Sequence, residues 1–296
     1  MIIGHQKIIS FLNKSIEKDK ISHAYIFAGP AHTGKFSAAL DFAAKLTGVE
    51  GDAISPNRVI VSPEIFEKKG IIKKLDIKVE HIRELQRKIG LTAEGSARKV
   101  AIVDGAERLT RSAQNALLKT LEEPPEKTIF ILIVENLEKM LPTILSRCQV
   151  KKFGLVSSGE MEKMIPDGTK NKEELVFWSL GRPGLLVNLL KNKEELEKRK
   201  EMLSELESLL SSDLGGRFAL AEKISKNSPE MLEKMGLWQV IFREKMNRGA
   251  DCAFLKSGVT SGKAFNFINE IEKSLTILKG TNANPRLVLE NLFLKF

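Results

Sequence analysis

A glycine-bearing loop near the start of the chain constrains its fold more than any other feature. The pattern G-x-x-x-x-G-K occurs as Gly29-Pro30-Ala31-His32-Thr33-Gly34-Lys35. An apolar run at 24–28, typical of a buried strand, precedes the loop, and helical spacing from Lys35 to Leu46 follows it. Between a strand and a helix, such a loop can surround phosphate groups with backbone N–H groups while Lys35 neutralises their charge. The pattern predicts a nucleotide-binding P-loop rather than a chance glycine-rich turn.

The residue after Lys35 departs from the P-loop pattern. A Ser or Thr at that position would ligate Mg²⁺, but the chain has Phe36 there and Ser37 one place late. One step along a helix turns a side chain by about 100°, so we expect the Ser37 hydroxyl to miss the ion. The sequence leaves the binding of ATP or ADP open and predicts an impaired Mg²⁺ site.

A second apolar strand, 99–104, ends in Asp104. A carboxylate in this place is typical of the Walker B motif, which directs an Asp at Mg²⁺ beside the P-loop; the alternative is that Asp104 only caps the strand. Many P-loop ATPases follow this Asp with a Glu that activates water, but here Gly105 follows and the nearest glutamate is Glu107. The loss of a general base lowers a rate by about 10²–10⁴. We therefore expect nucleotide hydrolysis to be impaired.

Strand and helix signals alternate through the first half of the chain. Further apolar, β-rich runs lie at 58–61, 128–134 and 149–153. A helix capped by Thr110 or Ser112 should end before Pro124. This alternation predicts an α/β domain with a parallel sheet and helices on both of its faces. After about Gly154 the strand signals vanish, and the remaining patterns are helical.

Composition narrows the class of protein. A length of 296 residues suggests two or three domains. The net charge of +9 favours contact with a polyanion such as nucleic acid, although many lysines only keep a surface solvated. The two cysteines and four histidines lack ligand spacing, which predicts neither a disulfide framework nor a metal site. The longest apolar run, 129–134, is too short to span a bilayer, and the first residues lack a signal-peptide core, so we expect a cytoplasmic protein without membrane contact.

Four short motifs carry more specific information. They are Ile21-Ser22-His23-Ala24-Tyr25, the helix signature from Ala113 to Pro125, the segment from Leu141 to Cys148 with its Ser-Arg-Cys, and the segment from Asn282 to Glu290. Together they resemble the clamp-loader subunits of bacterial DNA polymerase III, which are AAA+ proteins. Among these subunits the chain is most similar to delta-prime, whose nucleotide site is characteristically degenerate. The likeness covers most of residues 1–153, with islands thereafter.

The resemblance implies an architecture and a set of partners. It implies an α/β RecA-like AAA+ domain at 1–153, a small helical lid at 154–190 and an all-α C-terminal collar for oligomerisation at 191–296. The chain would join clamp-loader ATPase subunits and a clamp-opening subunit, and the complex would load a sliding clamp onto primed DNA for the polymerase III holoenzyme. The chain would be a non-motor subunit that needs no cofactor, and its partners would hydrolyse ATP. Lysines and arginines between Lys68 and Arg98 are candidates for DNA phosphate contacts.

The resemblance also implies a role for Arg147, the arginine of the Ser-Arg-Cys motif. In clamp loaders this arginine reaches into the ATP site of the neighbouring subunit, where a guanidinium can stabilise charge on the γ-phosphate. The alternative is a surface arginine in an ordinary salt bridge. Cys148 has no His and Asp pattern beside it and is expected to be a core residue rather than a nucleophile.

The chain departs from its relatives in two places, and two rival functions stay open. Many relatives insert a four-cysteine zinc module after the P-loop helix, but 46–63 has no cysteine, so we expect no zinc. The sensor arginine of the ATP-driven relatives has no clear counterpart, because Arg182 lies two residues before Gly184, and Asn136 lies only near the sensor-1 region. The first rival function is an ATP-hydrolysing motor subunit of the gamma/tau type, and the second is another AAA+ nucleic-acid-binding protein.

Overall fold

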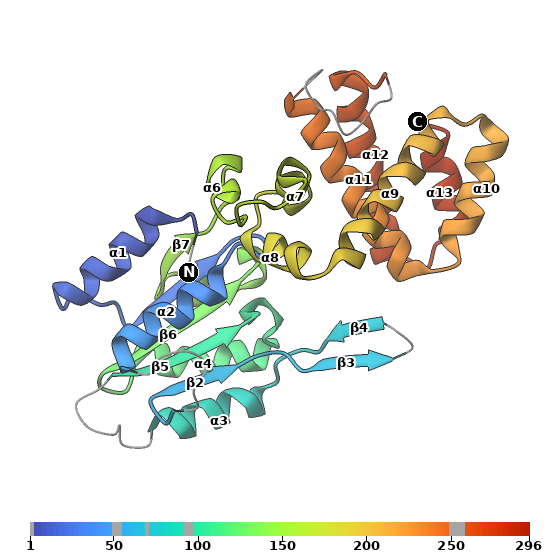
Figure 1. Cartoon of the computed structure of the whole chain (residues 1–296). Helices are drawn as coiled ribbons and strands as arrows, with labels where there is room; N and C mark the ends of the chain where they lie inside the picture. The colour runs from blue at the N-terminus through green and yellow to red at the C-terminus, as the bar shows by residue number, and fades with distance from the viewer. Residues whose placement is uncertain (1–2, 49–54, 69–70, 91–97, 249–257) are drawn as a thin grey trace. The chain divides into compact units, whose positions relative to one another are not determined.

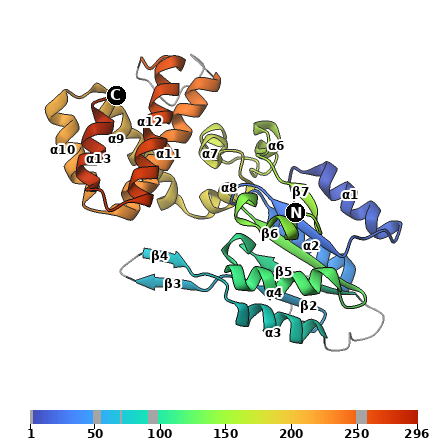
Figure 2. The same ribbon diagram turned by 180° about the vertical axis from the view of Figure 1, so that it is seen from behind.

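The computed structural model describes residues 3–48, 55–68, 71–90, 98–248 and 258–296. The chain divides into two compact units, Met1–Lys191 and Asn192–Phe296, and each has its own hydrophobic core. Figures 1 and 2 show the chain from two opposite sides. The units are described one at a time below.

A five-stranded parallel sheet forms the centre of the first unit, as the alternation of strands and helices predicted. The strand order is β2-β5-β6-β1-β7, and every neighbouring pair is parallel. Its strands are β1 (Ala24–Ala28), β2 (Arg58–Val61), β5 (Lys99–Asp104), β6 (Thr128–Val134) and β7 (Gln149–Lys152). Because all strands run in the same direction, the ends of β1, β5 and β6 meet at one edge of the sheet, where the P-loop begins.

Helices cover both faces of this sheet (Figures 1 and 2). On one face lie α1 (Gln6–Glu17) and α2 (Lys35–Thr47), and on the other lie α3 (Val79–Gly90) and α4 (Arg111–Glu122). Strand β1 supplies both cores, since Tyr25 and Phe27 pack toward α1 and α2 while Ala24 and Ile26 pack on the opposite side. The alternation follows from the two-residue period of a strand. A strand buried on both faces is therefore apolar throughout.

Short elements connect the strands at the edge that holds the P-loop. Thr110 caps α4 by accepting a hydrogen bond from Ala113 N at 3.3 Å, which makes it, and not Ser112, the N-cap. The remaining short elements are η1 (Ala106–Arg108), η2 (Leu137–Lys139) and α5 (Pro142–Leu145).

An antiparallel hairpin extends from the first unit after β2 (Figure 1). It consists of β3 (Ile65–Lys68) and β4 (Ile71–Lys74), and the sequence analysis did not predict it. At its base Leu75 N donates a hydrogen bond to Glu64 O at 2.9 Å. Beyond the base, Ile77 exchanges backbone hydrogen bonds with Arg108 and Thr110. The hairpin is therefore tied at its base to the segment that follows β5.

Three helices complete the first unit: α6 (Ser158–Glu162), α7 (Lys172–Ser179) and α8 (Pro183–Lys191). Trp178 and Leu186 are fully buried among them. The chain passes from the sheet to these helices through Val156, whose N–H donates to Gly181 O at 2.7 Å. Helix α8 ends one residue after the predicted limit at 190, and the division of this unit into a sheet domain and a lid stays a prediction.

The second unit is all-α among the residues that the structure describes. Its helices are α9 (Lys193–Ser211), α10 (Leu214–Ser225), α11 (Ser228–Arg248), α12 (Ser261–Gly280) and α13 (Pro285–Phe293). Trp238, Phe242 and Phe293 are fully buried in its core. The buried Lys234 ammonium lies 2.9 Å from Glu230 and also pairs with Glu205, so the charge has partners inside the bundle. None of the described helices is both long and apolar enough to cross a membrane.

Candidate nucleotide-binding site

The P-loop adopts a backbone that only glycine accommodates at two positions. Gly29 has φ 153°, and a Cβ built on it would lie 2.0 Å from Phe153 O. Gly34 has φ 92° and directly precedes α2. Two backbone hydrogen bonds, Gly29 N to Val134 O and Phe153 N to Ala28 O, join the start of the loop to β6 and β7. The predicted strand–loop–helix context of the P-loop is therefore present.

Residues distant in sequence hold the loop from both sides. His5 Nε2 lies 3.1 Å from Thr33 O, and because a carbonyl only accepts, Nε2 is the protonated nitrogen. Burial lowers the pKa of His5, which keeps the ring neutral, and the hydrogen bond to Thr33 opposes this shift only in part. On the other side, Gly184 N donates to His32 O at 2.9 Å. The loop is thus fixed by α1's N-terminus and by α8.

Lys35 is folded back onto the loop. Its ammonium donates to Gly29 O at 2.7 Å and to Pro30 O at 2.6 Å, and the residue is only 5% exposed. Burial lowers the pKa of Lys35, while the nearby carboxylates of Glu135, Glu107 and Asp104 act in the opposite direction. A bound phosphate would replace the carbonyl partners of this ammonium.

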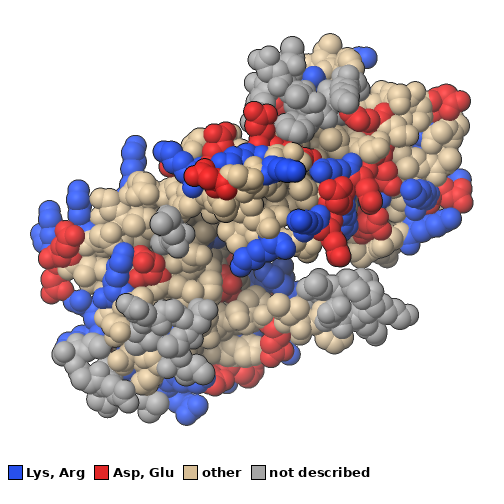
Figure 3. Space-filling model, viewed as in Figure 1, with Lys and Arg blue, Asp and Glu red and all other residues tan. Residues whose placement is uncertain are grey.

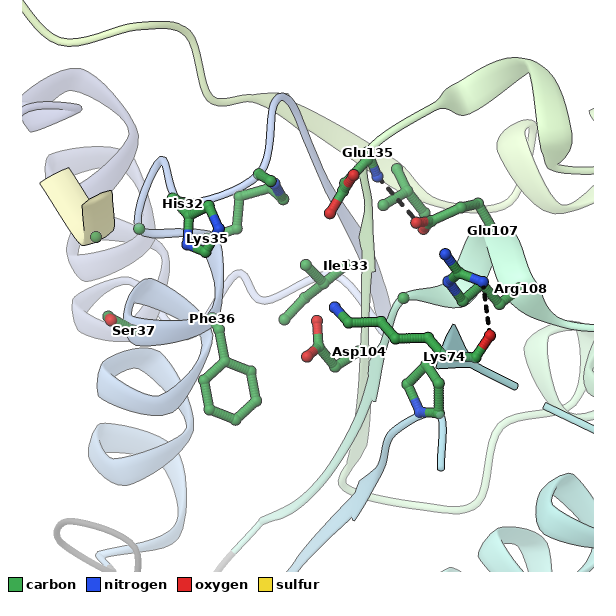
Figure 4. Close-up of a pocket in the computed structure, with 16 residues that line it drawn as sticks. His32, Lys35, Phe36, Ser37, Lys74, Asp104, Glu107, Arg108, Ile133 and Glu135 are labelled. Atoms are coloured by element: carbon green, nitrogen blue, oxygen red, sulfur yellow. Dashed lines mark hydrogen bonds between the residues drawn. The ribbon is translucent and has the colours of Figure 1, made fainter. Parts of the chain in front are cut away.

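A cavity of about 330 Å³ opens beside the loop (Figure 4). Of the predicted site residues it is lined by Ala31, His32, Gly34, Lys35, Phe36 and Asp104. The others, Gly29, Pro30 and Thr33, belong to the loop but do not line the cavity. The structure therefore brings the P-loop and the Walker B candidate to one pocket, although Lys35 and Asp104 are far apart in the chain.

The two residues after Lys35 lie differently with respect to Asp104. The Phe36 ring projects from α2 on the side of the pocket and is 38% exposed, whereas the Ser37 hydroxyl points away from Asp104 (Figure 4). Burial raises the pKa of Asp104, with Lys74 as the strongest opposing charge. Mg²⁺ requires octahedral oxygen ligands at about 2.0–2.1 Å. A phenyl ring in place of the hydroxyl removes one of these ligands.

Gly105, at the position of the water-activating Glu, has a structural reason to be glycine. Its φ is 67°, and a Cβ there would approach Pro63 Cγ to 3.1 Å. A glutamate would need a different backbone at this position. Glu107, the nearest glutamate, also lines the pocket, and its Oε2 accepts a hydrogen bond from Glu135 N at 3.3 Å.

Sequence reasoning missed three charged residues of the pocket: Lys74, Arg108 and Glu135. Glu135 follows β6 as Gly105 follows β5, so the meeting of parallel strand ends could have indicated it. Lys74 comes from the hairpin, which had no clear sequence signal. Arg108 Nη1 donates to Lys74 O at 3.0 Å and so fixes the end of β4 beside the pocket.

Asn136 and Arg182, the two candidates for sensor residues, differ in their place relative to the pocket. Asn136 Oδ1 accepts a hydrogen bond from Glu138 N at 2.8 Å and caps η2, and it does not line the pocket. Arg182 precedes α8, and its charge contributes, after burial, to the lowered pKa of His32. Arg182 therefore lies toward the P-loop.

Arg147 lies outside the pocket, on the surface of the same unit. Its Nη2 pairs with Glu122 Oε1 at 2.7 Å, and its Nη1 donates to Thr143 O at 3.0 Å. Glu122 is the last residue of α4, so the arginine is held beside the end of that helix. The neighbouring Cys148 packs against the core, and burial raises the pKa of its thiol to about 12.

The chain is similar to subunits of bacterial DNA polymerase III. The family model for "DNA polymerase III, delta subunit" matches residues 4–156. The delta-prime subunit of DNA polymerase III from Bacillus subtilis strain 168 is 31% identical over 220 residues, which cover 69% of this chain and 64% of that protein. The tau subunit from the same organism is 34% identical over 174 residues, covering 55% of this chain and 31% of tau. The chain thus spans less than two thirds of the length of either relative.

A solved structure supports the fold. A gamma subunit-related protein of DNA polymerase III from Thermotoga maritima has a TM-score of 0.52 with this chain, at 21% identity and 97% coverage of both chains. At that identity the likeness concerns the fold alone, which is the RecA-like AAA+ fold followed by a helical C-terminal region. With a family model that matches more than half of its residues, the chain belongs to the clamp-loader family of bacterial DNA polymerase III.

Proposed function

We propose that the chain is a non-motor, delta-prime-like subunit of the clamp loader, which contributes Arg147 to the ATP site of a neighbouring subunit. Its partners would be the ATPase subunits, a clamp-opening subunit, the sliding clamp and primed DNA, in the cytoplasm. The observation that carries the proposal is Phe36 in the pocket, at the position of the Mg²⁺-ligating hydroxyl. Without the hydroxyl ligand for Mg²⁺, the subunit would contribute to the complex through Arg147 and not through ATP hydrolysis of its own.

The pocket has two defects that act on the same reaction. Phe36 removes an Mg²⁺ ligand, and Gly105 removes the water-activating carboxylate. The loss of a general base alone lowers a rate by about 10²–10⁴. Glu107 comes three residues after Asp104 instead of directly after it, and its Oε2 accepts a hydrogen bond from Glu135 N. Turnover by this chain is expected to be negligible beside that of an intact subunit.

The Arg147 side chain can exchange its ion pair with Glu122 for an interaction with a neighbouring subunit. Its ion pair with Glu122 is solvent-exposed on both sides, with 36% and 50% of the two side chains exposed. Such surface pairs contribute about 0–1 kcal/mol. Bidentate hydrogen bonds from a guanidinium to phosphate are stronger, because both groups are charged and the geometry matches. A neighbour's γ-phosphate can therefore compete with Glu122 for Arg147.

We also propose contacts with DNA phosphates, but no single surface of the chain is assigned to them. On the face seen in Figure 3, lysines and arginines alternate with acidic side chains instead of forming one continuous patch. Among the candidates between 68 and 98, Lys88 pairs with Glu84 at 2.8 Å and Arg98 pairs with Asp19. We expect binding to DNA by the isolated chain to be weak and sensitive to salt.

The rival function of a motor subunit has one observation in its favour. Lys35 and Asp104, which are the phosphate- and metal-directed residues of an active site, line the same pocket. The two functions differ in what the purified chain does alone. A motor would hydrolyse ATP in the presence of Mg²⁺ and lose this activity in Lys35→Ala, whereas the non-motor subunit would show no turnover until its ATPase partners are added.

The decisive experiment measures ATP hydrolysis by the reconstituted complex without DNA. Arg147→Ala should leave the chain folded and assembled in the complex. The rate of ATP hydrolysis at the neighbouring site should fall about 10³-fold. Arg147→Lys should recover little, because lysine lacks the planar fork. Arg83→Ala is the matched control, since Arg83 is an exposed arginine on α3. Unchanged hydrolysis in Arg147→Ala would rule out the role of Arg147 in trans.

A further inference from the structure

Lys74 enters the pocket from an element outside the sheet. It is the last residue of β4, and its ammonium is directed toward the Asp104 carboxylate (Figure 4). Both residues line the cavity beside Phe36. In an active P-loop site, the space next to this carboxylate belongs to Mg²⁺.

The position of Lys74 is fixed at the backbone. Arg108 Nη1 donates to Lys74 O at 3.0 Å, and Leu75 N donates to Glu64 O at 2.9 Å. Ile77 N donates to Arg108 O at 3.0 Å, which joins the same segment to η1. Backbone hydrogen bonds therefore hold the segment that carries the Lys74 side chain in place.

The charges of the pocket are balanced without a metal. Lys35, Lys74 and Arg108 line the pocket together with Asp104, Glu107 and Glu135, which makes three cations and three carboxylates among the lining residues. Lys74 is the largest charge that opposes the burial-induced rise in the pKa of Asp104. It thus stabilises the charged form of this carboxylate, as a metal ion would.

An ammonium can perform part of the task of Mg²⁺ here. Its three N–H donors can join the Asp104 carboxylate to phosphate oxygens, and lysine is a common phosphate ligand. Mg²⁺ would need an oxygen ligand where Phe36 stands, and it would meet the positive charge of Lys74. The same residues that disfavour the metal therefore favour a phosphate group without it.

We propose that this pocket binds a nucleoside diphosphate or triphosphate in its metal-free form, with the Lys74 ammonium in the place of Mg²⁺. The inference rests on the proposed nucleotide site but not on the role of Arg147. The bound nucleotide would act as a structural ligand that joins the P-loop, β5 and the hairpin. Because hydrolysis needs the metal, such a ligand would remain intact.

Calorimetric titration of the full chain with ADP tests this, in excess Mg²⁺ and in EDTA. The wild-type chain should bind ADP at least as tightly in EDTA as in Mg²⁺. Lys74→Ala should weaken binding in EDTA about tenfold or more, because a hydrogen bond between two charged groups is lost. Lys78→Ala is the control, because Lys78 is exposed and does not line the pocket. Lys35→Ala should abolish binding if ADP occupies the P-loop.

A second variant tests the exchange of lysine for metal directly. Phe36→Thr combined with Lys74→Ala restores the hydroxyl and removes the competing cation, so ADP binding should become tighter in Mg²⁺ than in EDTA. Circular dichroism and the melting temperature check that each variant folds. Wild-type binding that Mg²⁺ strengthens tenfold, unchanged binding in Lys74→Ala, or no ADP binding at all would each overturn the proposal. None of these results bears on ATP hydrolysis by the complex with Arg147→Ala, so the two proposals fail separately.

Discussion

At the scale of single residues, the two P-loop glycines meet different constraints. Both have positive φ, but only Gly29 has a backbone atom within reach of a Cβ, at 2.0 Å from Phe153 O. Gly34 has nothing within 4 Å of that point. At a position with positive φ, any residue with a side chain strains the backbone. Where the added Cβ also clashes with another backbone segment, that segment has to move as well.

This difference predicts unequal costs for two alanine substitutions. Gly34→Ala should lower the free energy of unfolding by about 1–3 kcal/mol through backbone strain alone. Gly29→Ala should lower it by more, because the clash displaces the chain after β7. Urea unfolding of both variants measures the difference. Equal losses would mean that the close approach of Gly29 to Phe153 has no energetic consequence.

The thiol of Cys148, which is partly buried against the core, predicts that the stability of the chain depends on pH. Its pKa is about 12 in the folded chain against 9.0 for a free thiol, because burial disfavours the thiolate. The unfolded chain therefore releases this proton first, so stability is full below pH 9 and falls as the pH rises above it.

Urea unfolding of the wild-type chain and of Cys148→Ala, on either side of pH 9, measures this contribution. The wild-type chain should lose more stability than Cys148→Ala over the alkaline interval, and all other titrating groups are common to both. Parallel curves for the two proteins would contradict the burial of the thiol.

At the scale of elements, helix α4 is tied to the segment that carries Arg147. Gln114 is 5% exposed, and its Nε2 donates to Lys139 O at 3.1 Å and to Leu109 O at 3.3 Å. Its Oε1 accepts from Leu141 N at 2.8 Å. One amide side chain thus satisfies three backbone groups, on both sides of β6 in the chain.

Gln114→Leu should therefore destabilise the first unit by about 1–3 kcal/mol, because buried backbone groups lose their partners. Asn115→Leu is the matched control on the next, exposed position of α4 and should stay within about 0.5 kcal/mol. Thermal unfolding followed by circular dichroism compares the two. A smaller loss in Gln114→Leu than in Asn115→Leu would show that the amide hydrogen bonds do not hold this junction.

At the scale of the whole molecule, each unit has one of the chain's two tryptophans. Trp178 is 1% exposed in the first unit, and Trp238 is fully buried in the second. Because each unit has its own core, we expect them to unfold separately. Trp178→Phe leaves a fluorescence signal from the second unit only, and Trp238→Phe leaves one from the first.

Urea titrations of the two single-tryptophan variants should accordingly give transitions with different midpoints. Circular dichroism of each variant reports both units together and should show the two transitions in one curve. Fluorescence and circular dichroism curves that coincide in both variants would indicate a single cooperative unit instead.

Much of the fold and part of the site could be predicted from the sequence, because they depend on local signals. The apolar runs predicted the strands of the parallel sheet, and the P-loop, Phe36 and Gly105 are defined by neighbours in the chain. Thr110 and Ser112 could not be separated as caps, because both residue types suit the position and the backbone decides between them.

Only the tertiary structure decided which charges meet in the pocket. Lys74 reaches Asp104 because the hairpin is tied to η1, and Glu135 joins them because β5 and β6 are neighbours in the sheet. The pairing of Arg147 with Glu122 likewise depends on the packing of α5 against α4. A single sequence carries periodicity and turn chemistry over a few residues, but not the long-range strand order and packing that bring such side chains together.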